Sequence, residues 1–236
     1  MLDQAFEALK KYDYGTPISE LQGIEDAMVA AHGDPAVRQD LEQRLIAALG
    51  SEISRDAKDY VCRKLAGIGT PAAVPALSKL LPSETNSHLA RHALERIPGP
   101  EAAAALMTAA RQLSGKLKIG AIGSLGARGD SSSVATLASL LNDADPAVAR
   151  SAALSLGLIG GSEAAAVLIS ARQNGTGEKN SVIDALLECA ESLLSSKQTA
   201  DAKAIYESLS GDQQPRLIRL AATRGLLACS ARTAAS

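Results

Sequence analysis

The sequence predicts an all-α fold, an α-α superhelix in which about five to seven helix pairs stack as a solenoid. Leucines separated by 12 residues recur four times, and unrelated helices would not keep one internal spacing. Each recurrence joins two apolar stretches through a break that contains glycine. Alternating runs of β-branched or aromatic residues, typical of strands, are missing, and the chain has one Phe and no Trp. The pairs are Leu65 and Leu77, Leu94 and Leu106, Leu125 and Leu137, and Leu156 and Leu168.

The clearest repeat runs from Asp145 to Leu168. Asp145 offers a capping carboxylate, and the proline that follows it is tolerated at the first helical position. Gly160 and Gly161 let the chain leave the first helix in a backbone conformation that other residues resist. One side of this helix is expected to face the core, because it carries a stripe with the helical period, Val148, Ala152, Ala153 and Leu156.

The second helix of each repeat should begin at a capping residue. Side-chain oxygens of Ser, Thr and Asp accept hydrogen bonds from the free N–H groups of a first helical turn. We expect three such caps, Thr70, Asp130 and Ser162.

Residues 1–52 are expected to form N-terminal capping helices. Asp34 and Pro35 open a helix that runs to Leu49 and is rich in charge, which suits a terminal pair with one face in water. The preceding helix is predicted to carry one apolar stripe, Ile18, Leu21, Ile24, Ala27 and Met28.

The rest of the chain divides into residues 53–173, with four clear repeats, and residues 174–236, a degenerate C-terminal repeat and a final helix. No linker of low complexity interrupts the chain, so we expect residues 1–236 to be a single α-solenoid domain. The last apolar stretch, Leu217 to Cys229, has no partner helix. Either this helix caps the array or the natural protein continues beyond Ser236.

The charge balance argues against nucleic-acid binding. The formal net charge is −2, whereas nucleic-acid binders concentrate Lys and Arg on one face. Residues 1–60 carry 12 acids and 6 bases, and residues 61–236 carry 14 acids and 18 bases. The net charge therefore changes from −6 to +4 along the chain, which we interpret as ordinary solvated faces.

No membrane partner is expected, because no stretch of 18 apolar residues occurs. The N-terminus has acids where a signal peptide needs an apolar core. Cys62, Cys189 and Cys229 form no C-x-x-C motif and are interpreted as core residues. These features favour the cytoplasm, and a mature secreted or periplasmic segment is the alternative.

The stretch "DPAVARSAALSLGLIGGSEAAAVL" from Asp145 resembles a short bacterial HEAT repeat of the kind also found in phycobilin lyases. "CRKLAGIGTPAAVPAL" from Cys62 is a second close match, and the resemblance covers residues 54–173 best. The sequence departs from the pattern at Arg128, where an apolar residue is usual, and at Ile119, where an arginine is usual. The resemblance implies a curved α-solenoid whose second helices line a concave surface, where HEAT proteins commonly hold a partner.

The implied concave surface can be assigned by aligning the second helices on their leucines. This places Lys79 with Thr108, and Pro82 with Arg111, in small, largely neutral columns that face solvent. Such a surface has no aromatic rings for stacking and suits a peptide or protein segment. The alternative is that it is simply the solvent face of alanine-rich helices. The candidate partner-binding residues are Lys79, Thr108, Arg111, Ala135, Ser139, Asn142, Ser170 and Gln173.

One pair of residues in the sequence is compatible with an enzymatic function. His88 and His92 stand at i, i+4, a spacing with which two imidazoles can share a metal. Among HEAT-like proteins, deoxyhypusine hydroxylase holds iron through His-Glu dipeptides, and none occurs here. We therefore predict no catalytic residues, no metal and no cofactor. The sequence predicts a non-catalytic protein-interaction scaffold of unknown partner and oligomeric state; the alternative is an auxiliary lyase-like or metal-dependent HEAT-repeat enzyme.

Overall fold

The regular secondary structure of this protein is entirely helical over residues 1–234, which the computed structural model describes. This confirms the predicted all-α fold. The chain forms two compact units, unit 1 (Met1–Ser124) and unit 2 (Leu125–Ser236). Helix α8 (Gly115–Arg128) contains the boundary between them. The expectation of one domain over residues 1–236 stays a prediction, and its last two residues lie outside the described residues.

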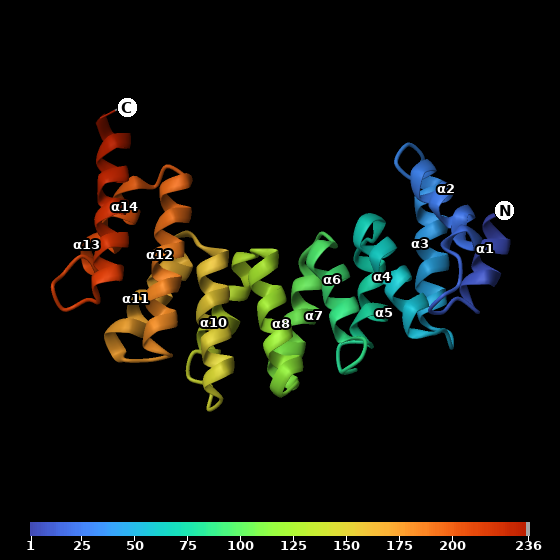
Figure 1. Cartoon of the computed structure of the whole chain (residues 1–236), viewed down its shortest axis with the longest axis horizontal. Coiled ribbons are helices and arrows are strands. Elements are labelled where there is room, and N and C mark those ends of the chain that lie inside the picture. Colours follow the sequence, from blue (N-terminus) through green and yellow to red (C-terminus); the bar gives the residue numbers. More distant parts are fainter. Residues whose placement is uncertain (235–236) are drawn as a thin grey trace. The chain divides into compact units, whose positions relative to one another are not determined.

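Unit 1 consists of helices packed in two rows (Figure 1). The first helices of successive repeats, α4 (Arg55–Ile68) and α6 (Ser87–Arg96), pack against each other. The second helices, α5 (Val74–Ser78) and α7 (Pro100–Gln112), do the same. Before them come α1 (Leu2–Leu9), η1 (Ile18–Leu21), α2 (Gln22–Ala30) and α3 (Pro35–Leu49), and the short turn η2 (Pro71–Ala73) leads into α5.

Unit 2 repeats this arrangement. Its first helices α10 (Pro146–Ile159) and α12 (Lys179–Ser195) pack together, as do the second helices α9 (Val134–Leu140) and α11 (Gly161–Asn174). The final helix α14 packs on α13 and on α12. The remaining elements are η3 (Ser131–Ser133), α13 (Thr199–Leu209) and α14 (Arg216–Ala234).

The repeated leucines form the centre of each helix pair. All eight leucines of the four pairs are 0% exposed, and burial of one such side chain is worth about 1.5–3 kcal/mol. The stripe of the clearest repeat is buried with them, from Val148 to Leu156. The 12-residue spacing therefore identified the core positions correctly.

Small residues allow the first helices of unit 2 to approach closely. A Cβ atom at Gly157 on α10 would lie 2.9 Å from the Cα of Ala185 on α12, closer than carbon atoms can pack. One turn along α12, the thiol of Cys189 is buried and lies 3.7 Å from the carbonyl oxygen of Leu156. A bulkier residue at Gly157 would force the two helices apart.

Several predicted caps are confirmed. The Asp145 carboxylate accepts a hydrogen bond from the N–H of Ala147 at 2.9 Å. Thr70 accepts one from the N–H of Ala72 at 3.2 Å. Asp34 caps α3 in the same way. These side chains satisfy N–H groups that have no partner within their own helix.

The cap predicted at Ser162 is wrong. Gly160, with φ +66°, ends α10 and directly precedes α11, which begins at Gly161. Ser162 is thus already inside the helix, and its hydroxyl donates to Gln198 Oε1 at 2.9 Å. Asp130 does precede η3 but forms no cap hydrogen bond; its carboxylate accepts from Arg128 instead.

The N-terminal stripe is only partly correct. Leu21 and Ile24 are fully buried, but Ile18 is 59% exposed. Leu21 has φ −97° and ψ 8°, which separates η1 from α2. This break changes the register, so Ile18 does not continue the buried side of α2.

None of the helices within residues 1–234 combines the length and the hydrophobicity needed to cross a membrane.

Candidate functional site

All eight candidate partner-binding residues are exposed. In unit 1, Lys79 directly follows the last residue of α5, and Thr108 and Arg111 lie on α7. In unit 2, the candidates lie on α9 and α11 or in the turn after α9, and these two helices pack together: Ala135, Ser139, Asn142, Ser170 and Gln173. Each unit therefore has its own exposed second-helix face.

The hydroxyl groups on these faces are bonded to their own helices. Thr108 donates to the carbonyl of Ala104 at 2.9 Å, and Ser139 donates to the carbonyl of Thr136 at 2.7 Å. Among residues 1–234, no His, Asp or Glu is hydrogen-bonded to either hydroxyl. A nucleophilic hydroxyl needs an adjacent base, so these side chains are suited to contact rather than to covalent chemistry.

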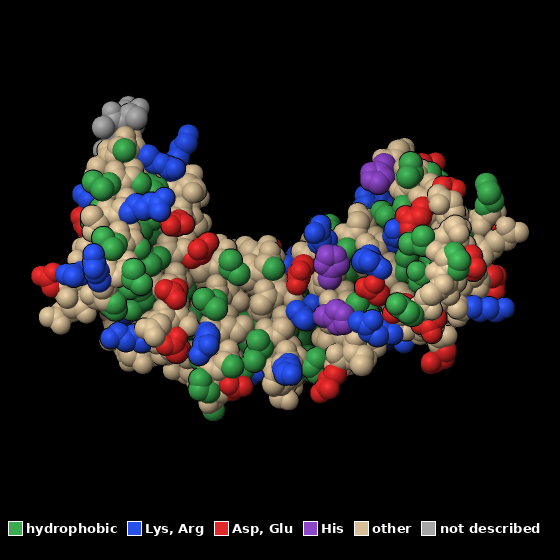
Figure 2. Space-filling view, viewed as in Figure 1, with side chains coloured by type: hydrophobic (Ala, Val, Ile, Leu, Met, Phe, Trp, Pro, Cys, Tyr) green, Lys and Arg blue, Asp and Glu red, His purple; other side chains and the backbone are tan. Residues whose placement is uncertain are grey.

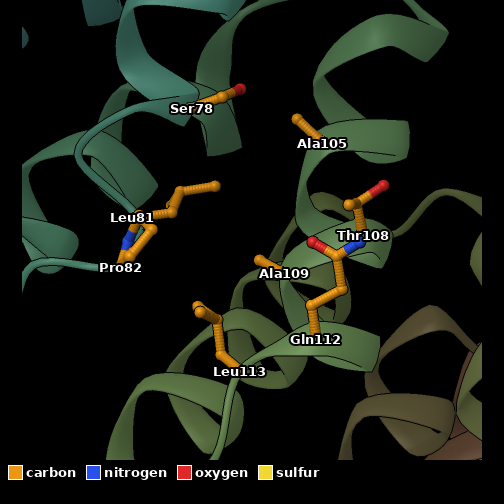
Figure 3. Close-up of a pocket in the computed structure, with 8 residues that line it drawn as sticks. All are labelled: Ser78, Leu81, Pro82, Ala105, Thr108, Ala109, Gln112 and Leu113. Carbon is orange, nitrogen blue, oxygen red and sulfur yellow. The ribbon is translucent and has the colours of Figure 1, made fainter.

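A hollow of about 390 Å³ opens between α5 and α7 in unit 1. Figure 3 shows Leu81 and Pro82 on one side of it and Ala105 and Thr108 on the other. Helix α5 ends at Ser78, which brings the residues that follow it to the rim. The lining is mainly apolar, with few polar groups: Ser78, Leu81, Pro82, Ala105, Thr108, Ala109, Gln112 and Leu113.

A second hollow, of about 480 Å³, lies between α11 and α13 in unit 2. Ile169 and Gln173 from α11 and Ala204 from α13 line it. Arg172 closes one side by donating to the hydroxyl and the carbonyl oxygen of Ser208, at 3.1 and 3.0 Å. Both units therefore have a hollow between neighbouring second helices.

The hollows contain only two of the predicted candidates, Thr108 and Gln173. Ala105 and Gln112 were missed although they lie three residues before and four after Thr108, a spacing that places them on its side of the helix. Ser208 could not be found, because α13 belongs to the degenerate part of the sequence where no leucine alignment holds.

An electrostatic cluster in unit 1 links α2 to α4, away from these faces. Glu25 accepts hydrogen bonds from the Tyr60 hydroxyl and from Lys64 Nζ, both at 2.7 Å. Partial burial acts to raise the pKa of Glu25, but these two donors outweigh it and lower the pKa. Burial, followed by the bond to Glu25, raises the pKa of Tyr60. This trio joins two helices and opens onto no hollow, so we assign it a structural role.

The histidine pair on α6 lies beside an arginine of α4. His88 and His92 are both exposed, and His88 Nε2 lies 3.3 Å from Arg55 Nη2. A guanidinium beside the imidazole repels a metal cation. Within the described part of the chain, no three His, Cys, Asp or Glu side chains gather closely enough to hold a metal ion.

Comparison with protein families matches residues 103–187 to the model for HEAT repeats. The resemblance noted in the sequence is thereby confirmed for this region. Comparison with curated protein sequences finds no match.

Solved structures with similar chains include human deoxyhypusine hydroxylase in complex with glycerol, at 15% identity and a TM-score of 0.40 over 98% of this chain and 96% of that one. An engineered protein has 20% identity and a TM-score of 0.38, with 98% of each chain covered. A designed armadillo repeat protein in complex with the peptide (KR)4 has 18% identity and a TM-score of 0.36, covering 97% of this chain and 99% of that one.

Proposed function

Since HEAT repeats occupy residues 103–187, we propose that this protein is a non-catalytic scaffold that binds a peptide or protein segment along its exposed second helices. The observation that carries the proposal is the hollow between neighbouring second helices in each unit. An extended segment can place apolar side chains in such hollows while its polar backbone stays at the rim.

The composition of the hollows supports a peptide over a small polar metabolite. In unit 1 the lining is mostly Ala, Leu and Pro, and Gln112 is the largest polar side chain. Small side chains such as that of Ala105 leave room for the backbone of a bound peptide to approach closely. Few charges would have to be desolvated, so binding is expected to depend weakly on salt.

The chemistry of the same faces favours binding over catalysis. Catalytic acids, bases and nucleophiles commonly have displaced pKa values in a cleft. The displaced values in unit 1 belong instead to groups such as Glu25 and Tyr60, which hold helices together.

A displayed library of random peptides, selected on the purified protein, tests the proposal. Placing charge in the hollows, by Ala105→Glu in unit 1 or Ile169→Glu in unit 2, should weaken selected peptides by more than about tenfold. Ser139→Arg and Ala135→Glu test the face of α9 in the same way. The matched control is Arg150→Glu, an exposed residue on α10.

Folding of each variant is checked by thermal unfolding. Substitutions at the exposed positions should change stability by no more than about 0.5 kcal/mol, and the half-buried Ala105 is expected to tolerate charge less well. If the selected peptides bind every hollow variant as tightly as the parent, or lose affinity equally with Arg150→Glu, the second-helix faces are not the binding site.

A further inference from the structure

The final helix, α14, exposes a row of leucines. Leu217, Leu220 and Leu227 are 77%, 55% and 68% exposed. They stand at i, i+3 and i+10, so they share one side of the helix with Arg224. The opposite side, which includes Ala222 and Cys229, is buried where α14 packs on α12 and α13. Three exposed leucines in one row exceed the scattered apolar residues of an ordinary surface.

Every charged residue of α14 is an arginine. Arg219 pairs with Asp212 at 2.8 Å, and Arg232 donates to the carbonyl oxygen of Leu194. Arg216 and Arg224 form neither an ion pair nor a hydrogen bond with the described residues. We call Arg216, Leu217, Leu220, Arg224 and Leu227 the C-terminal face.

A face of opposite charge lies on η1 and α2. Ile18 is 59% exposed and Val29 is 74% exposed. Glu20 and Asp26 are exposed between them, and neither has a cationic partner within the described residues. No Lys or Arg occurs from residue 12 to residue 37, and the base that reaches α2 from α4, Lys64, pairs with Glu25. We call Ile18, Glu20, Asp26 and Val29 the N-terminal face.

The two faces are matched in chemistry. Each combines large apolar side chains with two charges of one sign that form no ion pair within the described residues, and the signs are opposite. Asp26 accepts a hydrogen bond only from the neutral Gln22, at 2.9 Å. Figure 2 shows hydrophobic and basic side chains over α14 and hydrophobic and acidic ones over α1 and α2, with some charges of the other sign beside each.

We propose that the C-terminal face of one copy of this chain docks on the N-terminal face of a second copy, so that copies associate head to tail. The leucines would supply most of the affinity, and the charges would select the partner face. Such a contact uses two different surfaces, so a pair of copies still has one unused surface of each kind. Further copies can therefore add, unless the rotation between neighbouring copies closes a ring.

The charges argue against pairing of α14 with another α14. That contact would place the arginines of two C-terminal faces near each other, and like charges at an interface oppose association. The acidic N-terminal face is the complementary surface that this chain itself supplies.

Sedimentation velocity of the full chain, from about 1 to 200 µM, measures the association. We expect the average mass to rise with concentration past that of a dimer. Raising the salt from about 50 to 500 mM should weaken association without abolishing it, because salt screens the charges and not the apolar contact. Leu220→Ser with Leu227→Ser should weaken it at least about tenfold.

Charge exchange provides the decisive test. Glu20→Arg with Asp26→Arg makes both faces basic, and Arg216→Glu with Arg224→Glu makes both faces acidic. Each double variant alone should associate about tenfold more weakly than the parent. An equimolar mixture of the two should recover association, because each basic face then meets an acidic one. Asp184→Arg with Glu188→Arg, two exposed acids on α12, is the control and should behave as the parent.

Circular dichroism verifies that each variant is folded. If one of the two charge-exchange variants does not fold, the other still tests the proposal, because it alters a different face. A parent that stays monomeric at every concentration overturns the proposal. So does assembly that stops at a dimer and is unaffected by Glu20→Arg with Asp26→Arg, since that result identifies a symmetric α14 contact. These outcomes are independent of peptide binding to the second helices.

Discussion

Arg128 Nε donates a hydrogen bond to the carboxylate of Asp130 at 2.7 Å, and the Arg128 side chain is only 6% exposed. The corresponding position of the other repeats carries isoleucine, as at Ile68 and Ile159. The departure from the HEAT pattern is therefore a buried charge, and the carboxylate two residues later neutralises it. This explains why Asp130 does not cap η3.

Removing one partner of this pair should cost more than removing both. Asp130→Ala removes one carboxylate from a buried guanidinium and should lower the free energy of unfolding by about 1–3 kcal/mol, less than for a fully buried pair because Asp130 is 37% exposed. Arg128→Ile with Asp130→Ala restores the apolar residue of the other repeats and should lie within about 1 kcal/mol of the parent. Urea unfolding measures both. Equal losses of unfolding free energy in the two variants would show that the broken ion pair is not what destabilises Asp130→Ala.

Leu156→Asp should destabilise unit 2 selectively. Leu156 is 0% exposed, so the change places a carboxylate in an apolar core and costs about 3–5 kcal/mol. Because repeats are stabilised mainly by their neighbours, hydrogen exchange should accelerate within residues 125–234 while α1 to α6 stay protected. Uniform loss of protection along the chain would contradict this.

The histidine pair is expected not to bind metal. His88 lies beside Arg55, and two imidazoles without a third ligand make a weak site. Zinc or iron should therefore bind the parent no better than His88→Gln with His92→Gln. The measurement is metal content and calorimetry on protein prepared without a histidine tag. Stoichiometric metal that is lost in the double variant would favour the metal-dependent alternative.

The buried thiols are expected to be inert. Burial raises the pKa of Cys62 and of Cys189 to about 12, from an ordinary value of 9.0. Only the thiolate reacts, so at about pH 8 a thiol reagent should label either residue only as fast as its unit opens. Rapid labelling of the folded protein at Cys62 or Cys189 would contradict the buried packing.

The same shift links these thiols to alkaline stability. The folded state retains protons that unfolded thiols release near pH 9.0. The stabilisation is therefore complete below about pH 9 and is lost as the pH rises toward about 12. Between about pH 9 and about pH 12, the free energy of unfolding should fall less for Cys62→Ala with Cys189→Ala than for the parent. Urea unfolding at each pH measures this difference.

Much of the fold follows from local features of the sequence. The paired leucines such as Leu156 and Leu168 mark core positions, because a helix places residues at its own period on one side wherever it occurs. Caps such as Asp145 act within a few residues of the chain. These signals need no knowledge of distant partners, and repetition makes them stronger.

The candidate faces were predicted less completely than the core. Alignment on the leucines correctly placed residues such as Thr108 and Gln173 at the surface, since positions opposite a buried stripe face water. It did not reveal the hollows, because their walls come from two helices about 30 residues apart in the chain. Whether a partner occupies them stays a prediction.

By itself, the sequence determined the helical class, the repeat spacing and the buried leucines, because helical period and apolar burial act within each repeat. Only the tertiary structure decided which side chains meet across repeats. Helix termination at Gly160 displaced the cap expected at Ser162, and the break at Leu21 turned Ile18 outward. Ser162 instead donates a hydrogen bond to Gln198, which lies in the next repeat. Such outcomes depend on backbone direction at single residues and on distances between helices, and neither follows from a local pattern.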